Sequence, residues 1–292
     1  MKRFLILFLL SSFLLTSCSS ADSSADTASD SPAQYIENKG SDTIVNLALA
    51  WAEAYQVDHP DVRISVTGGG SGTGIAALVN GTVDIANASR KIKDEETAEA
   101  QTNGVTPVEH IIARDAIAVI VNPNNPVNEL TLQQISDIYS GKYTNWQDVG
   151  GEDRPIVKLS RETNSGTHVY FLETVLRLGE KENKTLFSMD TLLLPSSEGI
   201  ISEVRQNPNA IGYDGLGYVP DDLKMIAIAK EAGGEYVLPS IATVNDKTYA
   251  IARDLYMYTN GDPTGIVKDY LDWILSEEAQ QIVAELGFVP AK

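Results

Sequence analysis

The sequence predicts an α/β protein with largely parallel sheets, folded as two lobes with a ligand cleft between them. From Tyr35 onward, short β-branched runs alternate with longer runs of helical periodicity. About 260 residues remain after the N-terminal segment, which is enough for two medium-sized domains. Similar polar turns occur both before and after one long strand-like segment. In folds of this class, ligands lie at the carboxyl ends of the strands.

The N-terminus has the pattern of an export signal. Lys2 and Arg3 precede an apolar stretch from Phe4 to Leu15 that is too short to span a membrane. Leu-Thr-Ser-Cys, ending at Cys18, resembles a bacterial lipoprotein cleavage site, in which the cysteine becomes the lipidated first residue. We therefore expect a signal peptide over residues 1–17 and an extracytoplasmic protein anchored to a bacterial membrane, in the periplasm or at the cell surface, through lipid on Cys18. The alternative is an ordinary signal peptide with an incidental cysteine.

Residues 18–34 consist mostly of Ser, Ala and Asp, and we expect a disordered tether there. The folded part begins at residue 35. Strands are expected over residues 61–67, 83–88, 115–122, 155–160, 210–215 and 225–229. Helices are expected over residues 45–56, 131–141, 168–179 and 267–287.

Two segments are expected to connect the lobes. Residues 109–131 look like a strand that leaves one lobe and enters the other, and residues 249–259 look like the return. This places residues 35–118 and 250–292 in lobe I and residues 119–249 in lobe II. Because ligand pockets favour domain interfaces, we place the cleft between the lobes.

The chain is strongly acidic, with a formal net charge of −18. Such a charge argues against binding to nucleic acid and against electrostatic docking on anionic lipid, because both need a basic surface. It does not exclude a small anionic ligand. Oriented backbone dipoles and hydrogen bonds act over a few ångströms, whereas surface charges are screened beyond about 8–10 Å at physiological salt.

Three turns of similar composition precede helical runs. A small hydroxyl residue and a glycine at a helix start, together with unpaired backbone N–H groups and the positive end of the helix dipole, form a socket for an oxyanion. Taken singly, each turn is also consistent with an ordinary N-cap. The turns are Gly40-Ser41-Asp42-Thr43, Ser71-Gly72-Thr73 and Ser165-Gly166-Thr167.

Arg161 lies four residues before Ser165. Its guanidinium group offers a planar fork of donors that suits an oxyanion, although a surface arginine before a capped helix is the alternative. The glycine-rich stretch 68–74 does not qualify as a nucleotide phosphate loop, because it lacks the required lysine. It is interpreted as a glycine turn that admits a small group, with Ser71 and Thr73 as hydroxyl donors.

Asp42 is unexpected beside an oxyanion socket. It either stabilises the first helical turn, by about 0.3–1 kcal/mol, or accepts a hydrogen bond from a protonated oxyanion. The second interpretation favours hydrogen phosphate over sulfate, which carries no proton. Ser89 and Arg90 are expected in the cleft wall. Asp84 is expected to tie a loop, and it is the next carboxylate to test for the proton-accepting role.

The sequence offers little for catalysis. His59, His110 and His168 are scattered and lack metal-ligand spacing, and the single cysteine belongs to the predicted anchor. We therefore expect neither an enzyme nor a metal site, and no cofactor.

Five segments resemble, in order and spacing, the phosphate-binding proteins (PstS) of the bacterial phosphate ABC importer. They cover residues 40–55, 66–90, 132–151, 160–173 and 209–219. The resemblance implies a type II periplasmic-binding-protein fold with two crossing strands, which closes on one inorganic phosphate and delivers it to the permease subunits of an ABC importer. We expect a monomer. The predicted phosphate-binding residues are Ser41, Asp42, Thr43, Ser71, Gly72, Thr73, Ser89, Arg161, Ser165, Gly166 and Thr167.

The chain departs from the family pattern at two positions. Many members have an acidic residue, the suggested proton acceptor, where this chain has Ser89, so Asp42 is the expected substitute. Asn164 stands where glycine is frequent, and a mild effect is expected because asparagine tolerates unusual backbone angles. The alternatives are a receptor for sulfate, molybdate or phosphonate, a secreted enzyme, or a surface sensor or adhesin that reuses the fold.

Overall fold

The structure, a computed structural model, describes residues 33–291. The predicted signal peptide, Cys18 and nearly all of the predicted tether lie outside the described residues. The first strand begins at Gln34, one residue before the predicted start of the folded part. Within the described range, no helix is both apolar enough and long enough to cross a membrane.

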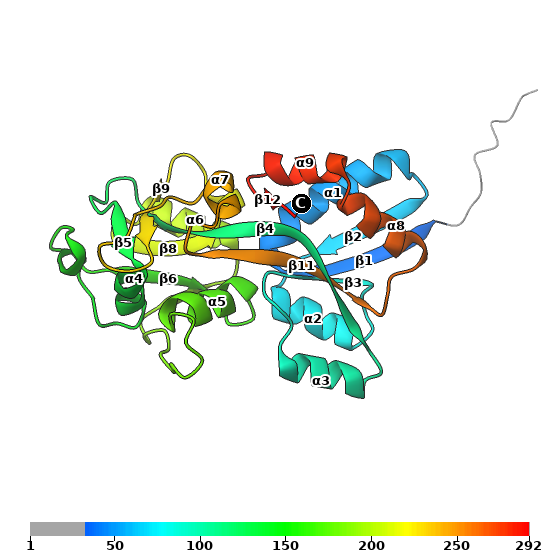
Figure 1. The fold of residues 1–292 in the computed structure, drawn as a ribbon, viewed down its shortest axis with the longest axis horizontal. Coiled ribbons are helices and arrows are strands. Elements are labelled where there is room, and N and C mark those ends of the chain that lie inside the picture. The colour runs from blue at the N-terminus through cyan, green and yellow to red at the C-terminus, as the bar shows by residue number, and fades with distance from the viewer. Residues whose placement is uncertain (1–32, 292) are drawn as a thin grey trace, which may run out of the picture. The chain divides into compact units, whose positions relative to one another are not determined.

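Strands and helices alternate along the chain (Figure 1). The strands are β1 (Gln34–Gly40), β2 (Val62–Thr67), β3 (Ile85–Ala88), β4 (Pro107–Val121), β5 (Glu129–Thr131), β6 (Val157–Arg161), β7 (Leu192–Leu194), β8 (Ala210–Gly215), β9 (Lys224–Met225), β10 (Ala227–Ala229), β11 (Ala252–Asn260) and β12 (Val289–Pro290). The α-helices are α1 (Asp42–Asp58), α2 (Ser71–Val79), α3 (Asp94–Thr102), α4 (Leu132–Tyr139), α5 (Gly166–Phe171), α6 (Ser197–Gln206), α7 (Ile241–Asn245), α8 (Gly265–Ile274) and α9 (Glu277–Glu285).

The main sheet has the strand order β2-β1-β3-β11-β4-β8-β6-β7. Strand β4 pairs with β11 along its first part and with β8 along its last part, changing partner between Ala116 and Ile117. Figure 1 shows β4 and β11 running side by side through the middle of the molecule. The expectation of largely parallel sheets is therefore only half right. Strands β1, β2 and β3 are parallel, as are β6, β7 and β8, but β4 and β11 are antiparallel to their neighbours.

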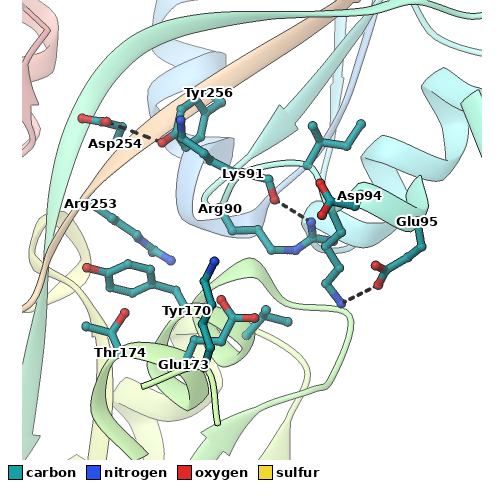
Figure 2. A pocket seen from close by; sticks show the side chains of 14 residues that line it. Arg90, Lys91, Asp94, Glu95, Tyr170, Glu173, Thr174, Arg253, Asp254 and Tyr256 are labelled. Carbon is teal, nitrogen blue, oxygen red and sulfur yellow. Dashed lines mark hydrogen bonds and ion pairs between the residues drawn. The ribbon is translucent and has the colours of Figure 1, made fainter. Parts of the chain in front are cut away.

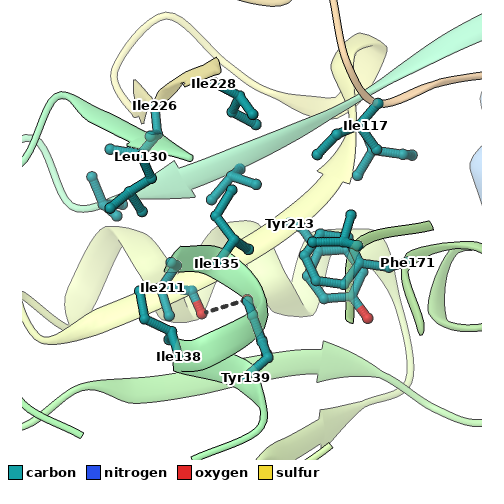
Figure 3. Packing of buried hydrophobic residues seen from close by; sticks show 14 of the residues in the cluster. Ile117, Leu130, Ile135, Ile138, Tyr139, Phe171, Ile211, Tyr213, Ile226 and Ile228 are labelled. Atoms are coloured by element: carbon teal, nitrogen blue, oxygen red, sulfur yellow. Dashed lines mark hydrogen bonds between the residues drawn. The ribbon is translucent and has the colours of Figure 1, made fainter. Parts of the chain in front are cut away.

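The buried side chains form separate clusters along this sheet. One lies beneath α1, α8 and α9 and contains Trp51 and Tyr270. Another lies around α4 and α5 (Figure 3), where the rings of Phe171 and Tyr213 stack with centroids 3.6 Å apart. In the second cluster, the Tyr139 hydroxyl donates to the Leu159 and Ile211 carbonyls at 3.1 and 3.2 Å. Separate clusters at either end of β4 agree with two lobes, whose exact bounds stay a prediction.

Several predicted elements differ in detail from the structure. The run 267–287, expected as one helix, is two, because the Ser276 hydroxyl accepts from the Ala279 N–H and begins α9. The helix expected over 168–179 begins earlier, at Gly166, and continues past Phe171 as a π-helical turn, Leu172–Leu176. Strand β1 and helices α3, α6 and α7 were not among the expected elements.

Two helical glycines give a matched test of the packing beneath the predicted socket. A Cβ added at Gly74 in α2 would lie 2.5 Å from the Lys39 carbonyl oxygen and 2.6 Å from Gly40 Cα. A Cβ at Gly199 in α6 would meet only ordinary contacts at 3.5 and 3.7 Å. We expect Gly74→Ala to lower the free energy of unfolding by about 1–3 kcal/mol, since α2 must move away from β1.

Gly199→Ala is expected to raise the free energy of unfolding by up to about 1 kcal/mol, because alanine favours a helix more than glycine does. Urea unfolding of both variants measures the difference. Equal effects at the two positions would contradict the close packing of α2 on β1.

Candidate functional site

The predicted turns meet at the carboxyl ends of two sets of parallel strands. Ser41 follows β1, Ser71 follows the loop after β2, and Ser89 follows β3. Because these strands are parallel, their ends lie at one edge of the sheet. The Ser41 hydroxyl donates to Ser89 Oγ at 2.9 Å, and Ser71 Oγ lies 3.3 Å from Ser89 Oγ. The Ser89 N–H also donates to Ser71 Oγ, at 3.0 Å. All three side chains are buried.

The third turn approaches this group from the other half of the molecule. Strand β6 ends at Arg161, and Ser165 caps α5, its hydroxyl accepting from the Thr167 N–H at 3.2 Å. Thr167 Oγ1 lies 2.9 Å from Thr43 Oγ1. A Cβ on Gly166 would lie 2.2 Å from Ser71 Oγ, so only glycine fits. We call Ser41, Thr43, Ser71, Ser89 and Thr167 the hydroxyl cluster.

Asn164 joins the second and third turns directly. Its carbonyl accepts from the Gly72 N–H at 3.1 Å, and its side-chain amide donates to the Gly69 carbonyl at 2.9 Å. A Cβ on Gly70 would lie 2.8 Å from the Asn164 carbonyl oxygen. The asparagine at this position therefore bridges the two turns, which the sequence alone did not suggest.

Arg161 is 1% exposed and bonded on several sides. Its Nη2 donates to Asp42 Oδ2 at 2.6 Å, and its Nη1 donates to Ser197 Oγ at 2.9 Å. Asp214 Oδ2 lies 3.8 Å from Nη1. The second Asp42 oxygen accepts from the Gly69 N–H at 2.9 Å. Asp42 thus holds a guanidinium group that lies 119 residues away in the sequence, and Arg161 Nε has no partner among the described residues.

Arg253, on β11, is a second arginine that the sequence analysis missed. Its Nη2 lies 2.9 Å from Thr167 Oγ1 and 3.3 Å from Thr43 Oγ1, and its Nη1 donates to the Ser89 carbonyl at 2.9 Å. Asp115 Oδ2 accepts from Nη2 at 3.0 Å and from Nε at 3.3 Å. Two features of the sequence could have indicated this arginine. Asp115 is a charged residue at the start of an apolar strand, and Arg253 lies within the predicted crossing segment.

Other predicted residues lie at the edge of the cluster or outside it. The Thr73 hydroxyl donates to the Gly69 carbonyl at 2.6 Å, and Arg90 is paired with Glu96 at 2.6 Å. Asp84 ties a loop as expected, accepting from the Glu37 N–H at 2.8 Å. His168 is a buried first-turn residue whose Nδ1 lies 3.0 Å from Ser160 Oγ, and burial lowers its pKa.

The arrangement is rich in hydrogen-bond donors. Guanidinium groups donate and cannot accept, while the serine and threonine hydroxyls can do either. Hydroxyls that now bond to one another can turn to an oxyanion without losing hydrogen bonds. Within residues 33–291, no group of three or more His, Cys, Asp or Glu side chains is arranged to hold a metal ion. The geometry suits the binding of a small anion.

Comparison with known proteins identifies the family. The model of the PBP superfamily domain matches residues 25–278. The chain is 34% identical to the phosphate-binding protein PstS of Pseudomonas aeruginosa, over 87% of this chain and 82% of that protein. It is 30% identical to PstS of Bacillus subtilis, over 99% and 94%. The chain belongs to the PstS family of phosphate-binding proteins.

A solved structure agrees with this assignment. A substrate-binding protein of a phosphate ABC transporter from Clostridium perfringens, with bound phosphate, has 36% identity and a TM-score of 0.79. The match covers 89% of this chain and all of that one. The two-lobed type II periplasmic-binding-protein fold expected for a PstS-family protein is confirmed. These relatives are named as phosphate-binding or substrate-binding proteins, and the Clostridium perfringens protein as one of an ABC transporter.

Two buried carboxyl groups of this PstS-family protein have altered acidity. Burial raises the pKa of Asp115 to about 6, although the neighbouring Arg253 opposes the rise. Burial likewise raises the pKa of Asp214, against the effect of Arg161. Repulsion from the Asp214 carboxyl group also raises the pKa of Asp115. Burying these two carboxyl groups is energetically unfavourable, and they lie beside the two arginines that they hold in place.

The raised pKa of Asp115 predicts a pH effect on stability. Its ordinary pKa is 3.8, so between pH 4 and 6 the folded state holds a proton that the unfolded chain has lost. The stabilisation is complete below the ordinary value and is lost as the pH rises through about 6. Relative to Asp115→Asn, the wild type should lose about 1.4 kcal/mol per pH unit over this interval, and no more above it.

Urea unfolding of both proteins across pH 4–8 measures this difference. A difference between the two proteins that does not change with pH would contradict the raised pKa.

Proposed function

We propose that this protein is an extracytoplasmic receptor that binds inorganic phosphate between its two lobes and delivers it to the permease of an ABC importer. The observation that carries the proposal is the hydroxyl cluster, to which both halves of the molecule contribute and against which Arg253 is bonded. Membership of the PstS family supports phosphate as the ligand.

The proposed ligand set contains the residues of the three turns together with Ser89, Arg161 and Arg253. Serine and threonine hydroxyls would donate to phosphate oxygens, as would the backbone N–H groups at the starts of α1 and α5. Arg161 contacts Asp42 of the first turn through Nη2, and its buried Nε is a donor without a partner among the described residues. Local donors of this kind offset the repulsion expected from a chain of net charge −18.

The remaining features of the proposal concern location and partners. The lipoprotein-type sequence ending at Cys18 supports attachment to a membrane through lipid, and the tether would let the receptor reach a permease beside it. We propose lobe I as residues 35–118 and 250–292, and lobe II as residues 119–249. The receptor is proposed to act as a monomer and without a catalytic step.

Calorimetric titration of the refolded, ligand-free protein tests the proposal. We expect saturable binding of phosphate and much weaker binding of sulfate, molybdate and phosphonates. Tight binding of another oxyanion in place of phosphate would reassign the ligand, and failure to bind any of them would refute the proposal. A phosphatase assay on the same preparation tests the alternative of a secreted enzyme.

Arg161→Ala should weaken phosphate binding more than alanine at any single serine of the cluster. Loss of a buried cationic partner costs about 3–5 kcal/mol, whereas one hydroxyl hydrogen bond to a charged group contributes about 1.5–3 kcal/mol. Arg205→Ala is the matched control. Arg205 is an exposed arginine that pairs with Asp222, and neither residue belongs to the three turns. Titration calorimetry of Arg161→Ala, of the serine-to-alanine variants and of Arg205→Ala gives the order of their phosphate affinities. Binding by Arg161→Ala within a few-fold of wild type would place the ligand elsewhere.

Asp42→Asn tests how the receptor would distinguish phosphate from sulfate. If Asp42 accepts the proton of the ligand, the amide should weaken phosphate binding and strengthen sulfate binding, because Asn can donate to an unprotonated oxygen. Asp84→Asn is the control, since Asp84 ties a loop by accepting from Glu37. Competition titrations with phosphate and sulfate measure the ratio of the two affinities in wild type and in each variant. An unchanged ratio would leave Asp42 as a partner of Arg161 and a helix-start residue only.

A further inference from the structure

A pocket of about 790 Å³ opens beside the hydroxyl cluster, and we call it the side pocket. Residues from both halves of the molecule line it, among them Arg90, Tyr170, Glu173, Arg253 and Tyr256. In Figure 2, Arg253 and Tyr170 lie together at one edge of the pocket, and Asp94 and Glu95 lie at the opposite edge. Its lining carries both signs of charge as well as aromatic rings, so it can accept varied polar groups.

One side chain belongs to both the side pocket and the hydroxyl cluster. The Arg253 guanidinium bonds to Thr43 and Thr167 of the cluster and also lines the side pocket. It is 6% exposed and lies over the Tyr170 ring, 5.5 Å from the centroid. Arg253 donates two hydrogen bonds to Asp115 and one to the Ser89 carbonyl, and these bonds fix it in this position.

We infer that Arg253 forms the wall between the phosphate socket and the side pocket, and that this wall makes the receptor reject phosphate monoesters and phosphonates. The inference rests on the proposed function. To bind inorganic phosphate, the site must accommodate only four oxygens around phosphorus. To bind a monoester, it must also accommodate the organic substituent on one of them. The side pocket is an adjoining space with room for a substituent, and the fixed guanidinium lies between it and the hydroxyl cluster. A steric barrier of this kind gives selectivity beyond the hydrogen bonds themselves.

Two substitutions at this position separate the wall from the charge. Arg253→Ala removes both, while Arg253→Met removes the charge and keeps a long side chain in place. Either change would leave Asp115 buried without its cation, so each is combined with Asp115→Asn. Thermal unfolding with and without phosphate reports whether the variants are folded.

Competition titrations with inorganic phosphate and ethyl phosphate measure the selectivity ratio. Both variants should lose affinity for inorganic phosphate, because both lose the guanidinium group. The ratio in favour of inorganic phosphate should fall by about tenfold or more in the alanine variant and stay near the wild-type value in the methionine variant. Equal ratios in the alanine variant and the wild type would overturn the inference.

The wild type alone supplies a second test, which does not depend on the folding of any variant. If the wall is closed, ethyl phosphate and longer monoesters should all bind at least about a hundredfold more weakly than inorganic phosphate, whatever their length. Binding of ethyl phosphate within tenfold of inorganic phosphate would overturn the inference. Failure of the wild type to bind inorganic phosphate at all would instead refute the proposed function.

Discussion

Two guanidinium groups buried at the junction of the two halves are the constraint on which the site depends. Removing a charge from water is costly, and removing one partner of a buried ion pair costs about 3–5 kcal/mol. Arg161 therefore needs Asp42 and Asp214 close by, and Arg253 needs Asp115. The Arg161–Asp42 and Arg253–Asp115 pairs each join segments more than a hundred residues apart in the sequence. When these ion pairs form, they also bring the polar turns of the two halves together.

The sheet explains how the pairs are made. Arg253 and Asp115 are register partners on the antiparallel strands β11 and β4, so the pairing of the crossing strands itself places the guanidinium against its carboxylate. Asp42 stands at the start of α1, where the helix dipole also favours a negative charge. The parallel strands β1, β2 and β3 then bring Ser41, Ser71 and Ser89 to one edge, and α5 brings Thr167 from the other half.

The parts of the site that depend on local chemistry could be predicted from the sequence. A hydroxyl residue and a glycine between a strand and a helix form a recognisable turn wherever the chain goes, and Ser41, Ser71 and Ser165 are all found at such helix starts. The pairing of β4 with β11 could not be predicted, because antiparallel register over long separations leaves no periodic signal. Arg253 was missed for that reason, and the bridging role of Asn164 was missed because it depends on how the two turns approach each other.

We propose that an oxyanion binds where the hydroxyl cluster meets the two buried arginines. A crystal structure of the phosphate complex tests this binding site most directly. We expect phosphate in contact with Ser71, Thr167 and the N-terminus of α5, with its oxygens replacing the bonds among the hydroxyls while Arg253 keeps its bonds to Asp115. Phosphate bound in the side pocket or elsewhere, with the hydroxyl cluster unchanged, would show that the binding site is wrong.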